Sequence, residues 1–201
     1  MIALIDYDAG NTKSALKAIE AIGKEAVLTR DPKVILAADH VILPGVGAFG
    51  DAMGNLCKYH MDEVIHEVID KKTPFLGICV GLQLLFEDSE ETKGVKGLGI
   101  LPGHILKIPA SGDMKIPHMG WNSLHLPRES RLFQGIPEET YVYFVHSYYL
   151  HADCEDMVTA TTEYGTHIHA AVEKDNVFAV QFHPEKSSDM GLKILSNFVS
   201  L

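Results

Sequence analysis

The strongest chemical signal in the sequence is a cysteine with glycines two residues before and after it, Gly77-Ile78-Cys79-Val80-Gly81. An apolar run, residues 75–78, leads into it, and residues that favour helix, 80–87, follow it. This order predicts a sharp strand-to-helix turn that lifts the sulfur of Cys79 clear of the sheet, with the glycines relieving the crowding. The start of a helix favours negative charge, so we expect a nucleophilic thiolate. A buried structural cysteine is the alternative.

A base for this thiol stands far along the chain in His183-Pro184-Glu185, after an apolar run, residues 177–182. A thiol nucleophile needs a base, and the base needs an acceptor that orients it. Proline keeps the preceding residue extended, and residues two apart in an extended chain project to the same side. We therefore expect Glu185 to bind one ring nitrogen of His183 and the other nitrogen to face Cys79. A surface turn is the alternative.

A glycine-rich loop, Pro44-Gly45-Val46-Gly47-Ala48-Phe49-Gly50, allows two functions. Its G-x-G-x-x-G spacing is that of a dinucleotide-binding loop, but such a loop follows the first strand and needs an acid near the end of the next. Here the next strand ends in Gly77-Ile78-Cys79, with no carboxylate until Glu87. We therefore favour an oxyanion loop, whose backbone N–H groups bind the negative charge that develops on a reacting carbonyl.

Other residues give weaker signals. His167 and His169 share a strand face and could bind a metal ion, but no cysteine or acidic cluster joins them. Cys57 and Cys154 have no nearby base in the sequence, so we expect inert thiols. Three cysteines, none in a CxxC pair, favour a reducing compartment. The sequence predicts no metal site and no cofactor.

Alternating strands and helices position these residues in the first half of the chain. We expect strands at 2–7, 25–29, 40–43 and 75–78, and helices that end at Gly23, begin at Asp31-Pro32, and cover 61–72 and 80–87. Such alternation predicts parallel strands flanked by helices. After Gly94 the pattern predicts antiparallel hairpins and a last helix at 190–199, with strands at 98–108, 116–126, 141–150, 158–163, 168–172 and 177–182.

The predicted fold class is therefore α/β, with a mixed, mostly parallel central sheet and an added antiparallel portion in the C-terminal half. No linker or repeat divides the chain, so residues 1–201 are expected to form one domain.

Composition and charge restrict the partners. The chain has 201 residues, 46% of them hydrophobic and 22% charged, an ordinary globular mix. It carries 17 basic and 27 acidic side chains, a net charge of −10 without a basic cluster, so we expect no nucleic-acid or membrane partner. The longest apolar stretch, residues 74–86, is too short to cross a bilayer, and no basic n-region of a signal peptide is present. We expect a cytoplasmic protein.

Together, these motifs resemble those of the class I glutamine amidotransferases. The cysteine elbow with Gln83, and His183-Pro184-Glu185, carry the resemblance to the whole family. Other segments resemble the glutaminase subunits of imidazole glycerol phosphate synthase, an enzyme of histidine biosynthesis: residues 6–11, 44–47, 84–87, 94–98, 117–122, 143–148 and 181–186. Two positions depart from that pattern. Asp8 stands where a small residue is usual, and Val80 replaces a more usual leucine, a change that should matter little because the backbone of this residue carries its role.

The resemblance implies an enzyme that hydrolyses L-glutamine to glutamate and ammonia. In such enzymes the cysteine attacks the side-chain amide, the histidine moves the proton, and the glutamate orients the imidazolium, which here implies a triad of Cys79, His183 and Glu185. Backbone groups implied in stabilising the oxyanion belong to Val80, Gly45, Val46 and Gly47. Residues implied in holding the glutamine are Gly47, Gln83, His146, Ser147 and Tyr148.

The resemblance also implies a heterodimer with a cyclase subunit that is a (β/α)8 barrel. That subunit would use the ammonia to form imidazole glycerol phosphate and an aminoimidazole carboxamide ribotide. The residues implied at the interface are Asn11, Trp121, Asn122, Tyr143 and Lys186. Two alternatives remain: a glutaminase subunit of another synthase, and a stand-alone cysteine hydrolase of the same fold.

Overall fold

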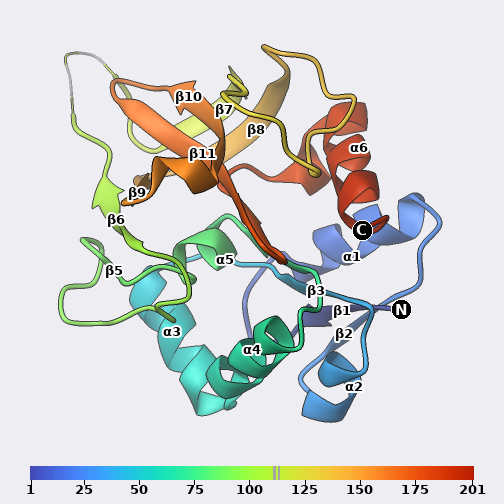
Figure 1. Ribbon diagram of the computed structural model, residues 1–201. Coiled ribbons are helices and arrows are strands. Elements are labelled where there is room, and N and C mark those ends of the chain that lie inside the picture. The colour runs from blue at the N-terminus through green and yellow to red at the C-terminus, as the bar shows by residue number, and fades with distance from the viewer. Residues whose placement is uncertain (111, 113) are drawn as a thin grey trace.

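Five parallel strands form one half of the central sheet in the computed structural model, which describes residues 1–110, 112 and 114–201 (Figure 1). Their order is β2-β1-β3-β4-β12, and each neighbouring pair runs parallel. All except the edge strand β2 are almost wholly buried, as expected for parallel strands covered on both faces. Their bounds are β1 Ile2–Ile5, β2 Ala26–Thr29, β3 His40–Leu43, β4 Phe75–Ile78 and β12 Val177–Val180.

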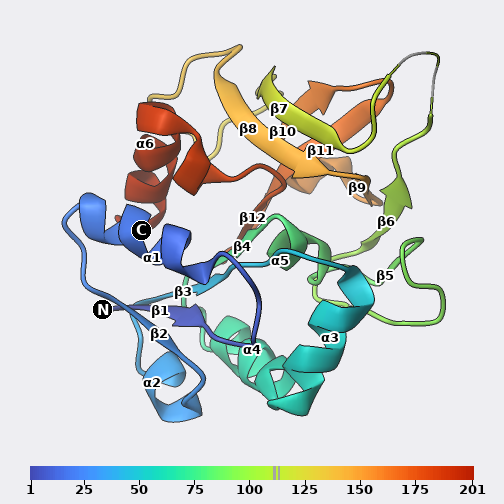
Figure 2. The ribbon, with the colours of Figure 1, turned by 180° about the vertical axis from the view of Figure 1, so that it is seen from behind.

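Helices cover both faces of this half. In Figures 1 and 2, α1 and α6 lie on one face and α2, α3 and α4 on the other. The predicted N-cap of α2 is confirmed, since the Asp31 side chain accepts a hydrogen bond from the Lys33 amide. Among the described residues, no helix combines the length and the apolar character that a membrane span requires. The bounds are α1 Thr12–Ala21, α2 Pro32–Leu36, α3 Phe49–Lys58, α4 Met61–Asp70 and α6 Ser188–Phe198.

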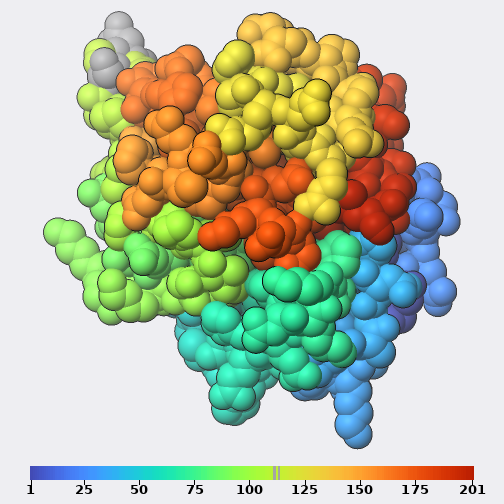
Figure 3. Space-filling model, viewed as in Figure 1, coloured from blue at the N-terminus to red at the C-terminus, as the bar shows by residue number. Residues whose placement is uncertain are grey.

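The second half of the sheet is mainly antiparallel. It continues from β12 through β11, β9 and β6 to β5, and β10 pairs with β11. Only the short edge pair β5–β6 runs parallel within the described part of this half. In the space-filling view of Figure 3 the orange surface of β10 and β11 lies at the upper left, above the level of α4. The bounds are β5 Asp88–Ser89, β6 Gly103–Lys107, β9 Tyr148–Ala152, β10 Val158–Glu163 and β11 His167–Lys174. The predicted mixed α/β fold is confirmed.

Two strands stand apart from the central sheet as an antiparallel ribbon, β7 (His118–Ser123) with β8 (Tyr141–His146), seen at the top of Figure 2. Its register places His118 opposite His146 and Trp121 opposite Tyr143. Because side chains alternate along a strand, these two pairs project from opposite faces of the ribbon.

Three expectations for individual elements need correction. The run 177–182 was expected only in the antiparallel portion; β12 does pair antiparallel with β11, but on its other side it pairs parallel to β4 and so joins the two halves of the sheet. The expected strand 141–150 breaks at Ser147 into β8 and β9, which belong to different sheets. Helix α3 was not expected, because the glycines of residues 44–50 suggested only a loop.

The helix after Cys79 is also shorter than predicted. It is α5, Val80–Gln83, rather than residues 80–87. The carbonyl groups of Leu84, Leu85 and Phe86 instead accept hydrogen bonds from the amides of residues 98–101. These bonds replace the helical bonds that would have continued α5, and they attach residues 98–101 to the segment that follows α5.

Candidate active site

Cys79 lies at the turn between β4 and α5 in a strained backbone conformation, with φ 55° and ψ −111°. Its amide donates to the Val180 carbonyl at 2.8 Å, which fixes the turn on β12. A Cβ atom on Gly77 would lie 2.7 Å from the Gly81 carbonyl oxygen, and one on Gly81 would lie 2.0 Å from that of Leu43. Only glycine fits at either position, so the structure contains the elbow that the sequence predicted.

His183 and Glu185 form a buried pair just beyond the end of β12. Nδ1 of His183 lies 2.8 Å from Oε1 of Glu185, and the two side chains are 2% and 3% exposed. The backbone of His183 is extended, as expected before proline, and its amide donates to the Tyr143 carbonyl of β8. Asn11 donates to the same Glu185 oxygen at 3.2 Å, so the first loop of the chain also orients this carboxylate.

The charges around His183 favour its protonated form. Burial of the ring opposes the charge, but the Cys79 sulfur and the Glu185 carboxylate outweigh it and raise the pKa of His183 to about 9. Nε2 of His183 is buried without an ordinary hydrogen bond to any described residue. The ring is therefore held by Glu185 through one nitrogen, while the other remains for Cys79 or a substrate.

The nucleophile and the histidine face one pocket of about 380 Å³. Seven of its lining residues were predicted to bind glutamine or the oxyanion: Val46, Gly47, Val80, Gln83, His146, Ser147 and Tyr148. The other lining residues are Cys79, Glu91, Pro117, Val145 and His183. A more open groove of about 800 Å³ around Arg131 and Glu173 contains none of these predicted residues.

Residues of the glycine loop after β3 have two different roles: some line the pocket, and one packs against the elbow. Val46 and Gly47 line the pocket, and Gly47 has φ 99°, which an L-residue rarely adopts. Gly45 does not line it. A Cβ on Gly45 would lie 2.7 Å from both the Gly81 amide nitrogen and the Tyr7 hydroxyl, so this glycine allows the loop to pack against the elbow.

Behind the pocket-lining residues Gln83 and Cys79 lies a residue that the sequence did not single out. Gln181, fully buried, accepts a hydrogen bond from Gln83 Nε2 at 3.1 Å, and its own Nε2 lies 3.7 Å from the Cys79 sulfur. Gln83 Nε2 also donates to the Tyr148 carbonyl at 3.1 Å. The signal for Gln181 was its position two residues before His183, which places both on one side of the extended chain.

Glu91, also not predicted, decides between the two functions of the glycine loop. Its carboxylate accepts a hydrogen bond from the amide of Phe49, the first residue of α3, and it lines the pocket. Thr92 accepts from the next amide, that of Gly50. A dinucleotide would need these amides for its phosphates, so a carboxylate already bound there disfavours that function.

The sequence and the fold match those of known proteins. The family model of glutamine amidotransferase class-I matches residues 3–201. The chain belongs to this family. Solved structures share the fold of this amidotransferase: PurLQS from Thermotoga maritima has a TM-score of 0.76 at 20% identity, with 99% of this chain and 97% of that chain covered. The glutaminase domain of CTPS from Trypanosoma brucei has a TM-score of 0.68 at 17% identity, with 99% and 93% covered.

Several relatives of this amidotransferase carry the name imidazole glycerol phosphate synthase subunit HisH. The relative from Methanocaldococcus jannaschii is 50% identical over 201 residues, and the match covers all of both chains. The relative from Moorella thermoacetica is 52% identical, covering all of this chain and 94% of its own. The relative from Geobacter metallireducens is also 52% identical, covering 98% and 96%.

The residues predicted at the interface fall into two groups. Trp121 is 51% exposed and contacts the edge of the Tyr143 ring, over which the Lys186 ammonium lies at 5.8 Å. Asn122 lies on the opposite face of β7, where its side chain donates to the Glu163 carbonyl. Asn11 is bound to Glu185. Trp121, Tyr143 and Lys186 therefore form an outer patch, whereas the side chains of Asn11 and Asn122 bind other groups of the chain.

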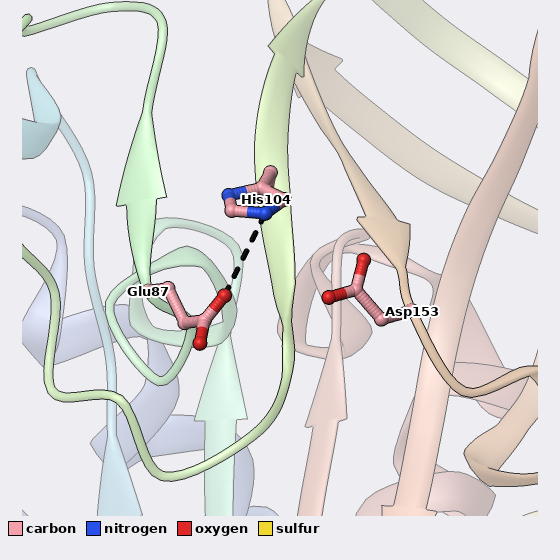
Figure 4. A group of neighbouring side chains, drawn as sticks. All are labelled: Glu87, His104 and Asp153. Atoms are coloured by element: carbon pink, nitrogen blue, oxygen red, sulfur yellow. Dashed lines mark ion pairs between the residues drawn. The ribbon is translucent and has the colours of Figure 1, made fainter.

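The described residues contain one group of three potential metal ligands, Glu87, His104 and Asp153 (Figure 4). It shares no residue with the pocket of this amidotransferase. Asp88 binds Nδ1 of His104 at 2.6 Å, and Glu87 pairs with Nε2 at 3.6 Å. Ion pairing between exposed groups accounts for this arrangement. The other two histidines considered for metal are engaged separately: His167 pairs with Glu163, and His169 accepts from the Ala152 amide.

Replacing Gly47 tests the oxyanion function of the loop. We expect Gly47→Val to lower kcat by about 10²- to 10³-fold, because valine disfavours φ 99° and rotation of the loop would move a backbone donor. Steady-state glutamate release measures the effect. Alkylation of Cys79 by iodoacetamide should remain near the parent rate, and loss of alkylation would instead show a misfolded elbow. Gly23→Val, at another positive φ on the far side of α1, is the control.

Proposed function

We propose that this amidotransferase hydrolyses L-glutamine through Cys79, His183 and Glu185 and delivers the ammonia to a synthase partner. The observation that carries the proposal is the strained elbow of Cys79 in one pocket with a histidine that a buried carboxylate orients. That arrangement has the parts of a nucleophile–base–acceptor triad.

In the first half of the reaction the Cys79 thiolate attacks the side-chain amide carbon of glutamine. The negative charge on the carbonyl oxygen would be bound by the amide of Val80, which as the first residue of α5 has no acceptor within the helix, and by an amide of the loop at Val46 or Gly47. Imidazolium His183 then protonates the departing nitrogen. The C–N bond breaks, ammonia leaves, and a γ-glutamyl thioester remains on Cys79.

In the second half a water molecule replaces ammonia. His183, now neutral, removes a proton from the water as it attacks the thioester, and the same amides bind the new oxyanion. The C–S bond breaks, glutamate leaves, and the thiolate–imidazolium pair is restored. One glutamine and one water give one glutamate and one ammonia.

The pocket also fits the amino-acid end of glutamine. Glu91 supplies a carboxylate that suits the α-ammonium group, and its bond to the start of α3 holds it in place. Gln83 is fixed by Tyr148 and Gln181, and the backbone of residues 146–148 closes the opposite side. The chain therefore surrounds a substrate that has an amide at one end and a charged amine at the other.

We further propose that the synthase is imidazole glycerol phosphate synthase, which would place this chain in histidine biosynthesis in the cytoplasm. Support comes from relatives that are 50–52% identical over 94–100% of their own length and carry the subunit name. The partner would be a cyclase subunit with a (β/α)8 barrel. A closed heterodimer would keep the ammonia from water, which at neutral pH protonates it to an unreactive ion.

The decisive experiment measures the glutaminase rate of the purified chain alone and with the cyclase subunit carrying its nucleotide ligand. Strong stimulation by that partner is expected. A high rate alone that the cyclase does not change would keep the thiol mechanism but indicate a stand-alone hydrolase. Stimulation only by a different synthase subunit would assign the chain to that synthase.

Lys186→Ala tests the outer patch. We expect it to weaken binding of the cyclase subunit by about three- to tenfold, because it removes the cation that lies over Tyr143 beside Trp121. Titration calorimetry measures the affinity. Lys33→Ala, an exposed lysine on α2 at the other side of the molecule, is the matched control and should bind as the parent does. Equal affinities for both variants would remove Lys186 from the interface.

A further inference from the structure

The β7–β8 ribbon has two faces with different surroundings. Its outer face exposes three large side chains, Met119, Trp121 and Tyr141, which are 62%, 51% and 60% exposed. Its inner face carries His118 and His146, which lie opposite each other and are 3% and 6% exposed. His146 lines the glutamine pocket. One narrow element therefore connects an exposed apolar surface with the substrate site.

Hydrogen bonds on the inner face determine where each imidazole carries its proton. Nδ1 of His146 lies 2.9 Å from the Tyr148 carbonyl, which can only accept, so Nδ1 must be the donor. Nε2 of a neutral His146 is then an acceptor, and the His118 Nδ1 that lies 2.9 Å away must donate to it. Nε2 of His118 is left to accept from the side-chain amide of Asn122, at 3.4 Å.

The surroundings of both rings favour the neutral form that this sequence of bonds requires. His118 is stacked between Phe144 and Tyr164, with ring centroids 4.8 and 3.9 Å apart. Burial lowers the pKa of His118 to about 4. Burial, opposed by the Tyr148 carbonyl and assisted by His118 and His183, lowers the pKa of His146 to about 3.

The last acceptor in the series belongs to the pocket. The Tyr148 carbonyl accepts hydrogen bonds from His146 Nδ1 and from Gln83 Nε2. Gln83 is bound in turn to Gln181, which lies beside the Cys79 sulfur. A shift of β7 would therefore alter the bonds of Asn122, His118 and His146 in turn and would reach the Tyr148 carbonyl.

We propose that His118 and His146 are positioning residues, a pair of neutral imidazoles that hold the Tyr148 carbonyl and Gln83 in place and make the glutamine pocket respond to a partner docked on the outer face of the ribbon. The identities of the pocket's ligand and of the docked partner rest on the proposed function. The tautomers and the series of hydrogen bonds are independent of it.

Nitrogen NMR of the free chain tests the tautomers without any substrate or partner. Long-range proton–nitrogen spectra at pH 7 should show both rings neutral, each with its proton on Nδ1. His118→Leu should move the Nε2 shift of His146 toward that of a nitrogen without a donor. A charged ring, or a proton on Nε2 in either histidine, would overturn the proposal.

Kinetics of three variants test the positioning role. His118→Leu removes the donor and should raise the KM for glutamine about three- to tenfold, with a smaller change in kcat, and should reduce stimulation by the cyclase subunit by a similar factor. His118→Asn keeps an N–H near the position of Nδ1 and should recover most of both effects. Tyr164→Phe keeps the stacking on His118 and loses only its bond to the Lys115 carbonyl, so it should behave as the parent.

The outcomes separate this proposal from the proposed function. If the parent chain hydrolyses no glutamine, the proposed function is wrong. The NMR experiment still tests the tautomers of His118 and His146, because it uses neither substrate nor partner. If the parent is active but the leucine and asparagine variants have equal KM values and melting temperatures, the role of His118 is only structural, and the proposal is wrong.

Discussion

Cys79→Ala should abolish glutamine hydrolysis, with kcat reduced by about 10⁴-fold or more, because no other thiol lines the pocket to form the thioester. Glutamate release at saturating glutamine measures the loss. Folding should be unaffected, since alanine meets the same backbone conformation as cysteine at this position, and the melting temperature should stay within a few degrees of the parent.

Two further measurements make this result specific. The pKa of His183 should fall from about 9 in the alanine variant, because the sulfur that helps to raise it is gone, and NMR titration of the ring reports the change. Cys57→Ala removes an exposed thiol on α3 and should leave both the rate and this titration unchanged. Hydrolysis by Cys79→Ala near the parent rate would exclude the thiol mechanism.

Glu185→Gln should lower kcat by about 10³- to 10⁴-fold while the fold is kept. Glutamine has the same shape, but its amide can present an N–H to Nδ1 of His183 and so place the ring proton on Nε2. A ring in that tautomer cannot accept a proton from the thiol. Loss of the carboxylate also removes one of the two groups that raise the pKa of His183, so the ring should titrate at lower pH.

The chain provides a matched control in Glu163→Gln. Glu163 also pairs with a histidine, His167, but both side chains are exposed and lie outside the pocket. We expect an unchanged rate, because an exposed ion pair of this kind contributes little to either folding or chemistry. If Glu185→Gln kept a tenth or more of the parent activity, His183 would not depend on its carboxylate partner.

The sequence was most informative where one residue type alone satisfies the backbone. Gly77 and Gly81 predicted the elbow because a side chain would be crowded there, and in the structure an added Cβ would lie 2.7 Å and 2.0 Å from a carbonyl oxygen. The pairing of His183 with Glu185 followed from the extended conformation that Pro184 imposes. Local rules of this kind do not depend on the rest of the fold, so they can be read directly from the chain.

Features that depend on distant contacts could not be predicted in the same way. The antiparallel pattern around β12 gave no sign that this strand inserts beside β4, because parallel pairing is set by the whole sheet. Helix α3 begins where Glu91, 42 residues later, caps its first amide. The role of Gln181 appears only when Gln83 and the sulfur of Cys79 are brought to it.

The backbone conformation of Cys79 is required for catalysis but lowers the stability of the folded protein, so catalysis and thermostability place opposite demands on this residue. A residue other than glycine at φ 55° and ψ −111° costs about 1–3 kcal/mol of folding free energy. A redesign procedure that scored only the folded backbone would replace Cys79 with glycine and obtain a more stable, inert protein. Any effort to stabilise this amidotransferase must therefore keep position 79 fixed and make its gains in regions remote from the elbow.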